Sequence, residues 1–329
     1  MGVKIAHFDD SASGNPHFAL RSTLGESPCY DDRRSPVMKI VVTGGSGRIG
    51  SETARLLRER GHDVLTLDVR PPADASLAHR VVDLRAASAL RKIFDGMDIV
   101  LHLGEMPGPG DTPSEGYTHN TEVGATVMQA ACQMGVKKLI YTSSCQVYGL
   151  WGIECGPVVE PQYLPLDEKH PMQPQNPYAL SKAANEQFAW MMSRRFGIPV
   201  AAYRFPAVWS SPLSEIVEWT KRRKRFEVPR DGLGAYLHIS DAASAYVCGV
   251  ERDWTGFEAF HFVANDHRYA TSSRQAMLER FPHAPLPEDW HADASPVSTA
   301  KARDMLGWVP KVNLRETILS NIPPMSAVA

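Results

Sequence analysis

A tyrosine and a lysine four residues apart, Tyr178 and Lys182, are the pair in this sequence best suited to move a proton. Residues at i and i+4 lie on one face of a helix, with Cβ atoms about 5–6 Å apart. A phenol is a poor base at neutral pH, but a neighbouring ammonium stabilises the phenolate. Tyr178 could then exchange the proton of an alcohol while a hydride leaves its carbon. Because Tyr-x-x-x-Lys is also common on ordinary helix surfaces, the pair needs support from elsewhere in the chain.

Ser144 supplies that support. It follows an apolar run that predicts a strand over 138–143, so its hydroxyl is expected at the carboxyl edge of a sheet. A serine there can donate a hydrogen bond to the substrate oxygen and steady the developing alkoxide. We therefore predict Ser144, Tyr178 and Lys182 as the catalytic residues.

A glycine-rich turn, Thr43 to Gly50, follows the apolar run Ile40-Val41-Val42 and opens an amphipathic segment. Strand, glycine turn and helix start form a phosphate cradle, because backbone N–H groups and the helix N-terminus favour a pyrophosphate. Two registers fit, Gly45-x-Gly47-x-x-Gly50 and Gly44-x-x-Gly47-x-x-Gly50. The alternative is a turn in which the glycines serve geometry alone.

Asp68 favours a dinucleotide. It ends a second predicted strand, 18 positions after Gly50, where a Rossmann unit places the ligand for the adenosine ribose hydroxyls. A carboxylate there repels a 2′-phosphate, so Asp68 predicts NAD rather than NADP. Arg70 leaves NADP open, since its guanidinium could accept the extra phosphate. Asp68 could instead be an ordinary strand-terminal turn residue.

The elements that must position these residues alternate between strands and helices from Met38 onward. This pattern predicts an α/β fold, a doubly wound parallel sheet of the Rossmann type with a small C-terminal substrate-binding region. The expected strands are 38–43, 64–68, 80–83, 98–103, 138–143 and 199–205, and the expected helices are 48–60, 86–95, 120–135 and 178–196.

Three segments divide the chain. Residues 1–37 read as an irregular N-terminal arm, although a true start at Met38 would look the same. Residues 38–205 form the predicted NAD-binding domain with the catalytic residues. Residues 206–329 form the substrate-binding region, in which 236–263 returns to the core. The proline-rich stretch 149–177 is expected to cover the site or to be irregular.

Composition excludes several classes of protein. A formal charge of −2 and the short basic run 221–225, which reads as a solvated helix face, suggest no nucleic-acid partner. No apolar stretch approaches the roughly 18 residues of a membrane span. Five scattered cysteines show neither metal-ligand spacing nor a disulfide framework, so we expect no metal and a cytoplasmic location.

Together these motifs resemble the extended short-chain dehydrogenase/reductases, the NAD-dependent epimerase/dehydratase group, over about residues 38–320. Further matches are Asp83-Leu84, Leu101-His102-Leu103-Gly104, Asn120-Thr121 opening a helix, His238-Ile239-Ser240-Asp241 and Lys301-Ala302-x-x-x-Leu306-Gly307-Trp308-x-Pro310. The resemblance implies that Asp83 and Leu84 flank the adenine and that Lys182 also holds the nicotinamide ribose. The cofactor residues expected are Gly44, Gly47, Arg48, Ile49, Gly50, Asp68, Asp83, Leu84, Leu103, Asn120, Tyr178 and Lys182.

The chain also departs from that group. Cys145 and Gln146 replace the acid pair of sugar-nucleotide dehydratases, so dehydration is disfavoured. Ala207 stands where nucleotide-sugar members carry asparagine. His238 lies only 34 positions after Arg204, and such a short segment offers few residues to bind a diphosphate. We therefore expect a small sugar, sugar acid or similar hydroxylated substrate.

Substrate contacts are the least specific expectation. Each candidate has an alternative: Glu105 could be an exposed loop carboxylate, Cys145 a buried structural thiol, and Trp151 and Trp209 ordinary core residues. His102 and His238 read as structural hydrogen-bonding residues. The residues expected at the substrate are Glu105, Ser144, Cys145, Arg204 and Trp209.

The sequence thus predicts an NAD-dependent oxidoreductase of a secondary alcohol or ketone. Two alternatives remain, an NAD-retaining epimerase of a sugar or nucleotide sugar and a catalytically silent NAD(P)-sensing protein, which the intact catalytic set argues against. A homodimer is also expected, because helical spacing gives the two long helices more apolar surface than one face needs. The residues behind that expectation are Val123, Val127, Ala130, Ala131, Phe188, Met191 and Met192.

Overall fold

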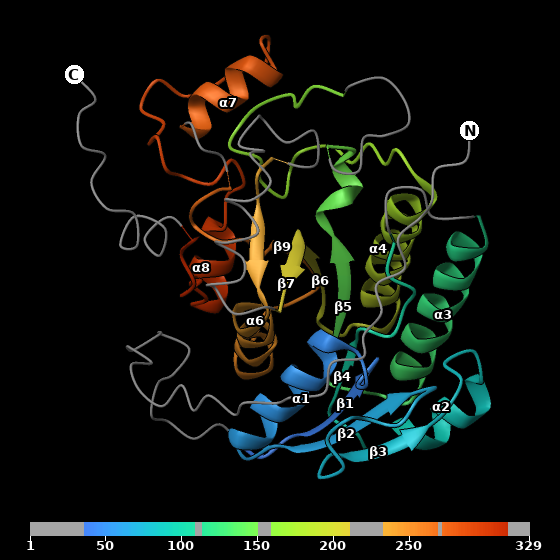
Figure 1. The fold of residues 1–329 in the computed structure, drawn as a ribbon. Coiled ribbons are helices and arrows are strands. Elements are labelled where there is room, and N and C mark those ends of the chain that lie inside the picture. Colours follow the sequence, from blue (N-terminus) through green and yellow to red (C-terminus); the bar gives the residue numbers. More distant parts are fainter. Residues whose placement is uncertain (1–35, 109–113, 151–158, 211–232, 269–271, 315–329) are drawn as a thin grey trace, which may run out of the picture.

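Seven parallel strands form the central sheet, in the order β3-β2-β1-β4-β5-β6-β9 (Figure 1). The computed structural model describes residues 36–108, 114–150, 159–210, 233–268 and 272–314. The order runs outward from β1 on one side and from β4 on the other. This is the doubly wound sheet that the sequence predicts, and its switch point is where such folds bind ligands. The strands are β1 Lys39–Thr43, β2 Asp63–Asp68, β3 Ala78–Val81, β4 Ile99–His102, β5 Lys138–Ser144, β6 Val200–Phe205 and β9 Phe257–His261.

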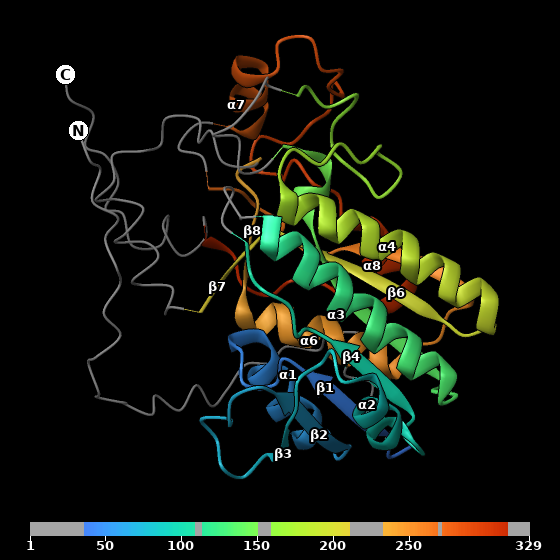
Figure 2. The ribbon, with the colours of Figure 1, turned by 90° about the vertical axis from the view of Figure 1, so that its right-hand side faces the viewer.

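Helices cover both faces of the sheet because its strands are apolar on both sides. In β1, Ile40 and Val42 face one core while Val41 faces the other. The first core also contains residues of α1 (Arg48–Glu59), α6 (Ile239–Glu251) and α8 (Ala300–Leu306). The second contains residues of α2 (Ala87–Phe94), α3 (Ser114–Gln133) and α4 (Pro177–Phe196). Figure 2 shows α3 and α4 side by side on that outer face.

A smaller layer lies at the carboxyl end of the sheet. There the short helix η2 (Cys145–Tyr148) and α7 (Ser273–Arg280) share a third apolar cluster, and α7 stands at the top of the molecule in Figure 1. Strands β7 (Ala207–Trp209) and β8 (Tyr236–His238) form a separate parallel pair. The segment 236–263 contributes β8, α6 and β9, whereas almost all of the predicted arm, 1–37, lies outside the described residues.

One predicted helix boundary is wrong. The sequence places Asn120-Thr121 at the start of a helix, but α3 begins at Ser114 and Asn120 lies within it. Asn120 is fully buried, and its side chain donates to and accepts from the backbone of Met106. It therefore ties the loop after β4 to α3 instead of capping a helix.

The described cysteines differ from one another. Cys132 and Cys145 are free thiols, whereas Cys248 is disulfide-bonded, which the scattered spacing did not predict. Among the described residues, no helix is long and apolar enough to cross a membrane. The same part of the chain has no cluster of three residues suited to a metal ion.

Close packing of α6 against β6 gives a test of this architecture. A Cβ at Gly249 would lie 1.8 Å from Oη of Tyr203, a residue with no exposed surface. We expect Gly249→Ala to lower the free energy of unfolding by about 1–3 kcal/mol, measured by denaturant titration, because the core cannot absorb the methyl group.

Tyr203→Phe is the matched control. The Tyr203 hydroxyl has no hydrogen-bond partner among the described residues, so its removal makes room without breaking a bond. The double variant should regain most of the loss. Additive losses in the double variant would contradict this packing.

Candidate active site

The glycine turn after β1 forms one wall of the site. Gly44 has a φ of +70°, which lets the chain reverse directly after Thr43. A Cβ on Gly50 would lie 2.2 Å from the Gly44 carbonyl oxygen, so only glycine lets α1 start this close to the turn. No side chain caps α1 at Gly47, and its first N–H groups remain available to an anion.

A cavity of about 580 Å³ opens above this turn at the β1/β4 switch point. Of the two predicted glycine registers, Gly44-x-x-Gly47-x-x-Gly50 contributes its three glycines to the lining, whereas Gly45 packs against Thr66. Most of the predicted cofactor residues also line the cavity. These are Arg48, Ile49, Asp68, Asp83, Leu84 and Leu103.

Asp68 is held at the cavity edge by the backbone. Its carboxylate accepts hydrogen bonds from the N–H of Ser46 at 3.2 Å and of Arg70 at 3.2 Å. Farther out, Asp83 forms an ion pair with Arg85 at 2.7 Å. Side-chain and backbone hydrogen bonds from Arg85 lower the pKa of Asp83 to about 2. Both carboxylates therefore present fixed negative charge to this end of the cavity.

Tyr178 and Lys182 lie at the start of α4, none of whose residues lines this cavity. The Asn176 side chain caps this helix by accepting from the N–H of Ala179 at 2.7 Å, and Pro177 occupies its first turn. This capped turn carries Tyr178, and Lys182 follows one turn later. The Lys182 ammonium lies 5.5 Å from the centre of the Tyr178 ring, as the i, i+4 spacing predicts.

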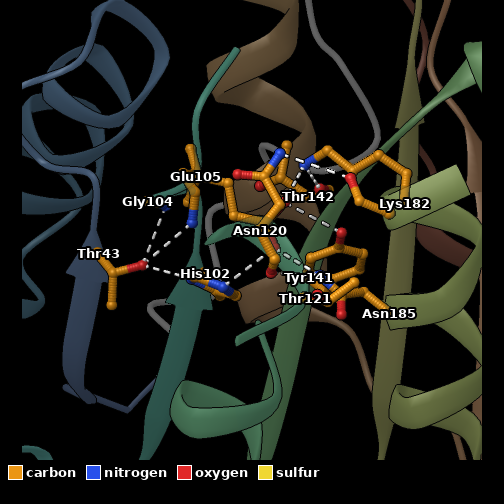
Figure 3. Close-up of polar contacts among 12 residues, drawn as sticks. Thr43, His102, Gly104, Glu105, Asn120, Thr121, Tyr141, Thr142, Lys182 and Asn185 are labelled. Carbon is orange, nitrogen blue, oxygen red and sulfur yellow. Dashed lines mark hydrogen bonds and ion pairs between the residues drawn. The ribbon is translucent and has the colours of Figure 1, made fainter. Parts of the chain in front are cut away.

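Lys182 is buried and engaged in two strong contacts (Figure 3). Its Nζ lies 2.6 Å from Oε2 of Glu105 and 2.7 Å from the carbonyl oxygen of Thr142. Burial alone would lower the pKa of Lys182 and raise that of Glu105. Their mutual attraction outweighs burial, so the pKa of Lys182 is raised and that of Glu105 is lowered. Both groups are therefore charged around neutral pH.

Lys182 stands behind the cavity wall. Glu105 and Thr142 line the cavity, and each contacts the Lys182 ammonium directly. Asn120, expected at the cofactor, likewise lies one layer behind, where it holds Met106 of the lining. The cavity is therefore shaped by residues that Lys182 and Asn120 fix in place.

Ser144 is positioned by the end of β5. Its Oγ accepts a hydrogen bond from the N–H of Gln146 at 3.2 Å and so caps the short helix η2. Because Oγ serves as the acceptor in this contact, its own hydrogen stays available for donation. The neighbouring Cys145 thiol is fully buried, and burial raises its pKa far above the ordinary value.

Four of the predicted substrate residues lie outside the cavity lining: Ser144, Cys145, Arg204 and Trp209. Arg204 is buried in an ion pair with Glu186 at 2.6 Å and also donates to Tyr148. Trp209 stacks on Tyr236 with ring centres 5.5 Å apart. Trp151 lies outside the described residues. These predicted substrate contacts stay predictions, and Glu105 is the candidate that reaches the cavity.

Sequence reasoning missed several residues that build the site. The Thr142 carbonyl oxygen accepts a hydrogen bond from Lys182, and the Asn185 amide donates one to Glu105. Their signals were present: Thr142 precedes Ser144 at a strand end, and Asn185 lies three residues after Lys182 on α4. His102, read as a structural hydrogen-bonding residue, accepts or donates to Thr43 at 2.7 Å.

The model of the "NAD dependent epimerase/dehydratase family" matches residues 40–258. A UDP-glucose 4-epimerase of Corynebacterium glutamicum is 26% identical over 326 residues, covering 86% of this chain and 94% of that protein. A UDP-glucose 4-epimerase of Yersinia enterocolitica is 34% identical over 269 residues, covering 68% of this chain and 77% of that protein.

Solved structures share the fold. MoeE5, in complex with UDP-glucuronic acid and NAD, has a TM-score of 0.63 at 24% identity, covering 85% of this chain and 96% of that one. UDP-glucose 4-epimerase from Bifidobacterium longum, in complex with NAD+ and UDP, has a TM-score of 0.63 at 21% identity. The alignment with this structure covers 85% of this chain and 96% of that one.

Proposed function

Because the chain belongs to the NAD-dependent epimerase/dehydratase family, we propose that it is an NAD-retaining epimerase that inverts one carbinol carbon of a sugar. The observation that carries this proposal is that UDP-glucose 4-epimerases align along nearly its whole described fold, with coverage of up to 86% of the chain. These relatives make the epimerase alternative stronger than the net oxidoreductase that the sequence first favoured. They also favour a sugar linked to a nucleotide over a free sugar.

The cavity fits a dinucleotide cofactor. A Cβ at Gly50 or Gly44 would fill space at the turn, so the sequence keeps the cradle open where a pyrophosphate would approach the N-terminus of α1. Asp68 would receive the adenosine ribose, and Asp83 and Leu84 would flank the adenine. Thr142 and Glu105 line the other end, where the nicotinamide would lie.

NAD, when bound, would accept a hydride from the carbinol carbon and return it to the opposite face. The side chains of this protein handle the proton. Tyr178 takes the proton of the hydroxyl group and later gives it back, while Ser144 donates a hydrogen bond to the same oxygen. Lys182 has one N–H beyond those used by Glu105 and Thr142, and we assign it to the cofactor ribose beside Tyr178.

A second candidate function rests on a specific observation. His238 lies only 34 positions after Arg204, which leaves few residues for holding a diphosphate, and Arg204 itself is committed to Glu186. That spacing favours net NAD-dependent oxidation of a free sugar or sugar acid. Ser144, Tyr178 and Lys182 would then catalyse the oxidation of the alcohol without its re-reduction.

A substrate panel distinguishes the two. The wild-type protein should convert UDP-glucose to its C4 epimer, detected by chromatography or NMR, without accumulation of NADH. Tyr178→Phe should lower the rate by about 10²–10⁴-fold while NAD binding is unchanged, because only the proton carrier is lost.

NADH accumulation with a free sugar or sugar acid, and no epimer from any nucleotide sugar, would replace the epimerase with the net dehydrogenase. Full activity in Tyr178→Phe would exclude Tyr178 as the proton carrier in either reaction.

Cofactor choice provides a separate prediction. The Asp68 carboxylate, fixed by two backbone N–H groups, should repel a 2′-phosphate. We expect NAD to bind at least about tenfold more tightly than NADP, a difference of about 1.4 kcal/mol, in a fluorescence titration. Asp68→Ala should reduce that preference, whereas Arg70→Ala should leave it intact. Equal or tighter binding of NADP would show that Arg70 outweighs Asp68.

We also propose a homodimer, on partly different residues from those the sequence suggested. Val123, Val127 and the other buried members of that set belong to the core of the chain itself. Phe188 and Met191 are partly buried against that core, whereas Leu180, at the start of α4, is 47% exposed. Leu180, Phe188 and Met191 recur at roughly helical spacing along α4, which Figure 2 shows beside α3. A cytoplasmic location stays a prediction.

Light scattering at micromolar concentration should give the mass of two chains. Leu180→Glu should yield the monomer, because a charge would be buried between the two copies of α4. Leu278→Glu is the control, since Leu278 is 44% exposed on α7, away from α4. A monomeric wild type would refute the dimer.

A further inference from the structure

Glu105 is a carboxylate of the cavity lining that accepts hydrogen bonds from three different residues. Its side chain is only 3% exposed, although it lies in the loop three residues after the end of β4. One oxygen lies 2.6 Å from the Lys182 ammonium and accepts from the Tyr141 hydroxyl at 3.2 Å. The other accepts from the Asn185 amide at 2.8 Å and faces Nε2 of His102 at 3.5 Å. Three hydrogen-bond donors thus converge on one buried carboxylate, which Nε2 of His102 faces without a hydrogen bond (Figure 3).

The hydrogen bonds of Thr43 determine how His102 faces this carboxylate. The Thr43 hydroxyl oxygen accepts from the N–H groups of Leu103 and Gly104, each at 3.2 Å. Its single hydrogen therefore points to Nδ1 of His102, 2.7 Å away. A neutral His102 then carries its proton on Nε2, which faces Glu105. Thr43 at the end of β1 is thus connected through His102 to Glu105, the partner of Lys182.

Glu105 also limits the hydrogen bonds that Lys182 can still donate and the charge that it presents to Tyr178. An ammonium has three N–H donors, and Glu105 and Thr142 accept two of them. One donor remains. In addition, the negative charge of Glu105 offsets the positive charge that would otherwise act on Tyr178, whose ring centre lies 5.5 Å from Nζ.

We propose that Glu105 is a positioning residue that acts through Lys182, fixing its ammonium and offsetting its charge, and so sets the pH range in which Tyr178 transfers protons. This proposal rests on the proposed function, because it concerns the proton carrier of that reaction. It assigns Glu105 to the catalytic machinery rather than to the substrate contacts expected from the sequence.

The surrounding charges determine the sign of the effect. The other titratable groups near Lys182 are Tyr141, Tyr178 and Glu186. Burial, followed by the Glu105 charge, raises the pKa of Tyr141 well above its ordinary value, so it stays neutral. Glu186 is compensated by its ion pair with Arg204. Removing the Glu105 charge therefore leaves the Lys182 charge unopposed and favours the phenolate form of Tyr178.

The test compares Glu105→Gln and Glu105→Asp with the wild-type protein. The acidic limb of the pH profile of kcat/KM should move to lower pH by about one unit in Glu105→Gln. The alkaline limb should also move down, because a buried lysine without its carboxylate loses its proton more easily. Glu105→Asp keeps the charge on a shorter side chain. Both limbs of its pH profile should therefore lie between those of the wild type and those of Glu105→Gln.

Glu251→Gln is the matched control. Glu251 is also a mostly buried carboxylate, paired with Arg60 at 2.9 Å at the end of α6. This variant should lose thermal stability, as Glu105→Gln does, without moving either limb. Unmoved limbs in both Glu105 variants, or an equal shift in Glu251→Gln, would overturn the proposal. If Glu105→Gln does not fold, Glu105→Asp decides the question by the same criterion.

A second measurement separates this proposal from the proposed function. Tyrosinate absorbance, followed against pH with Tyr178→Phe subtracted, reports the ionisation of Tyr178 without any substrate. Its midpoint should be about one pH unit lower in Glu105→Gln than in the wild type. If the wild type turns over no sugar, the proposed function fails while this titration still tests Glu105. An unchanged midpoint would overturn the role of Glu105 even in an active epimerase.

Discussion

Contact between two turns, the one after β1 and the one after β4, determines where the rest of the site can lie. A Cβ on Gly44 would lie 2.7 Å from Cα of Gly104, so the two backbones touch. At this distance the Thr43 hydroxyl reaches the N–H groups of Leu103 and Gly104 and also the ring of His102. The same contact brings the chain after β4 up to Glu105 against α4. A larger side chain at either glycine would separate the cofactor half from the proton-transfer half.

Helix α4 is tied to the sheet by charge as well as by apolar packing. Lys182 pairs with Glu105 on one side, and Glu186, one turn later, pairs with Arg204 of β6 on the other. Both pairs are almost completely buried, where removing one partner leaves an uncompensated charge. Such pairs fix the rotation and the axial position of the helix more strictly than apolar side chains do. These pairs therefore also fix the position of Tyr178, which lies in the first turn of α4.

Local sequence patterns were sufficient for the parts of the site that depend on neighbours in the chain. The glycine turn, Asp68 at a strand end and the spacing of Tyr178 and Lys182 follow from turn geometry and helix periodicity. The doubly wound parallel sheet follows from the alternation of strands and helices. The pairing of Glu105 with Lys182 could not be predicted in this way, because 77 residues separate them and only the packed sheet brings them together. The ion pair of Arg204 with Glu186 could not be predicted for a similar reason, since the two residues lie on different elements.

The chain leaves the sheet after β6 and returns to it as β9, which pairs directly with β6. Because the two strands are parallel, the region between them crosses from the carboxyl edge of the sheet back to the opposite edge, and α6 within it packs in the core. Only the loops of this crossover can change length freely, because doubling the length of a loop costs only about 0.6 kcal/mol of closure entropy. Descendants of one ancestor can shorten or extend these loops while the turn after β1 and the capped start of α4 keep their geometry. Substrate preference can thus diversify in evolution at little cost to folding.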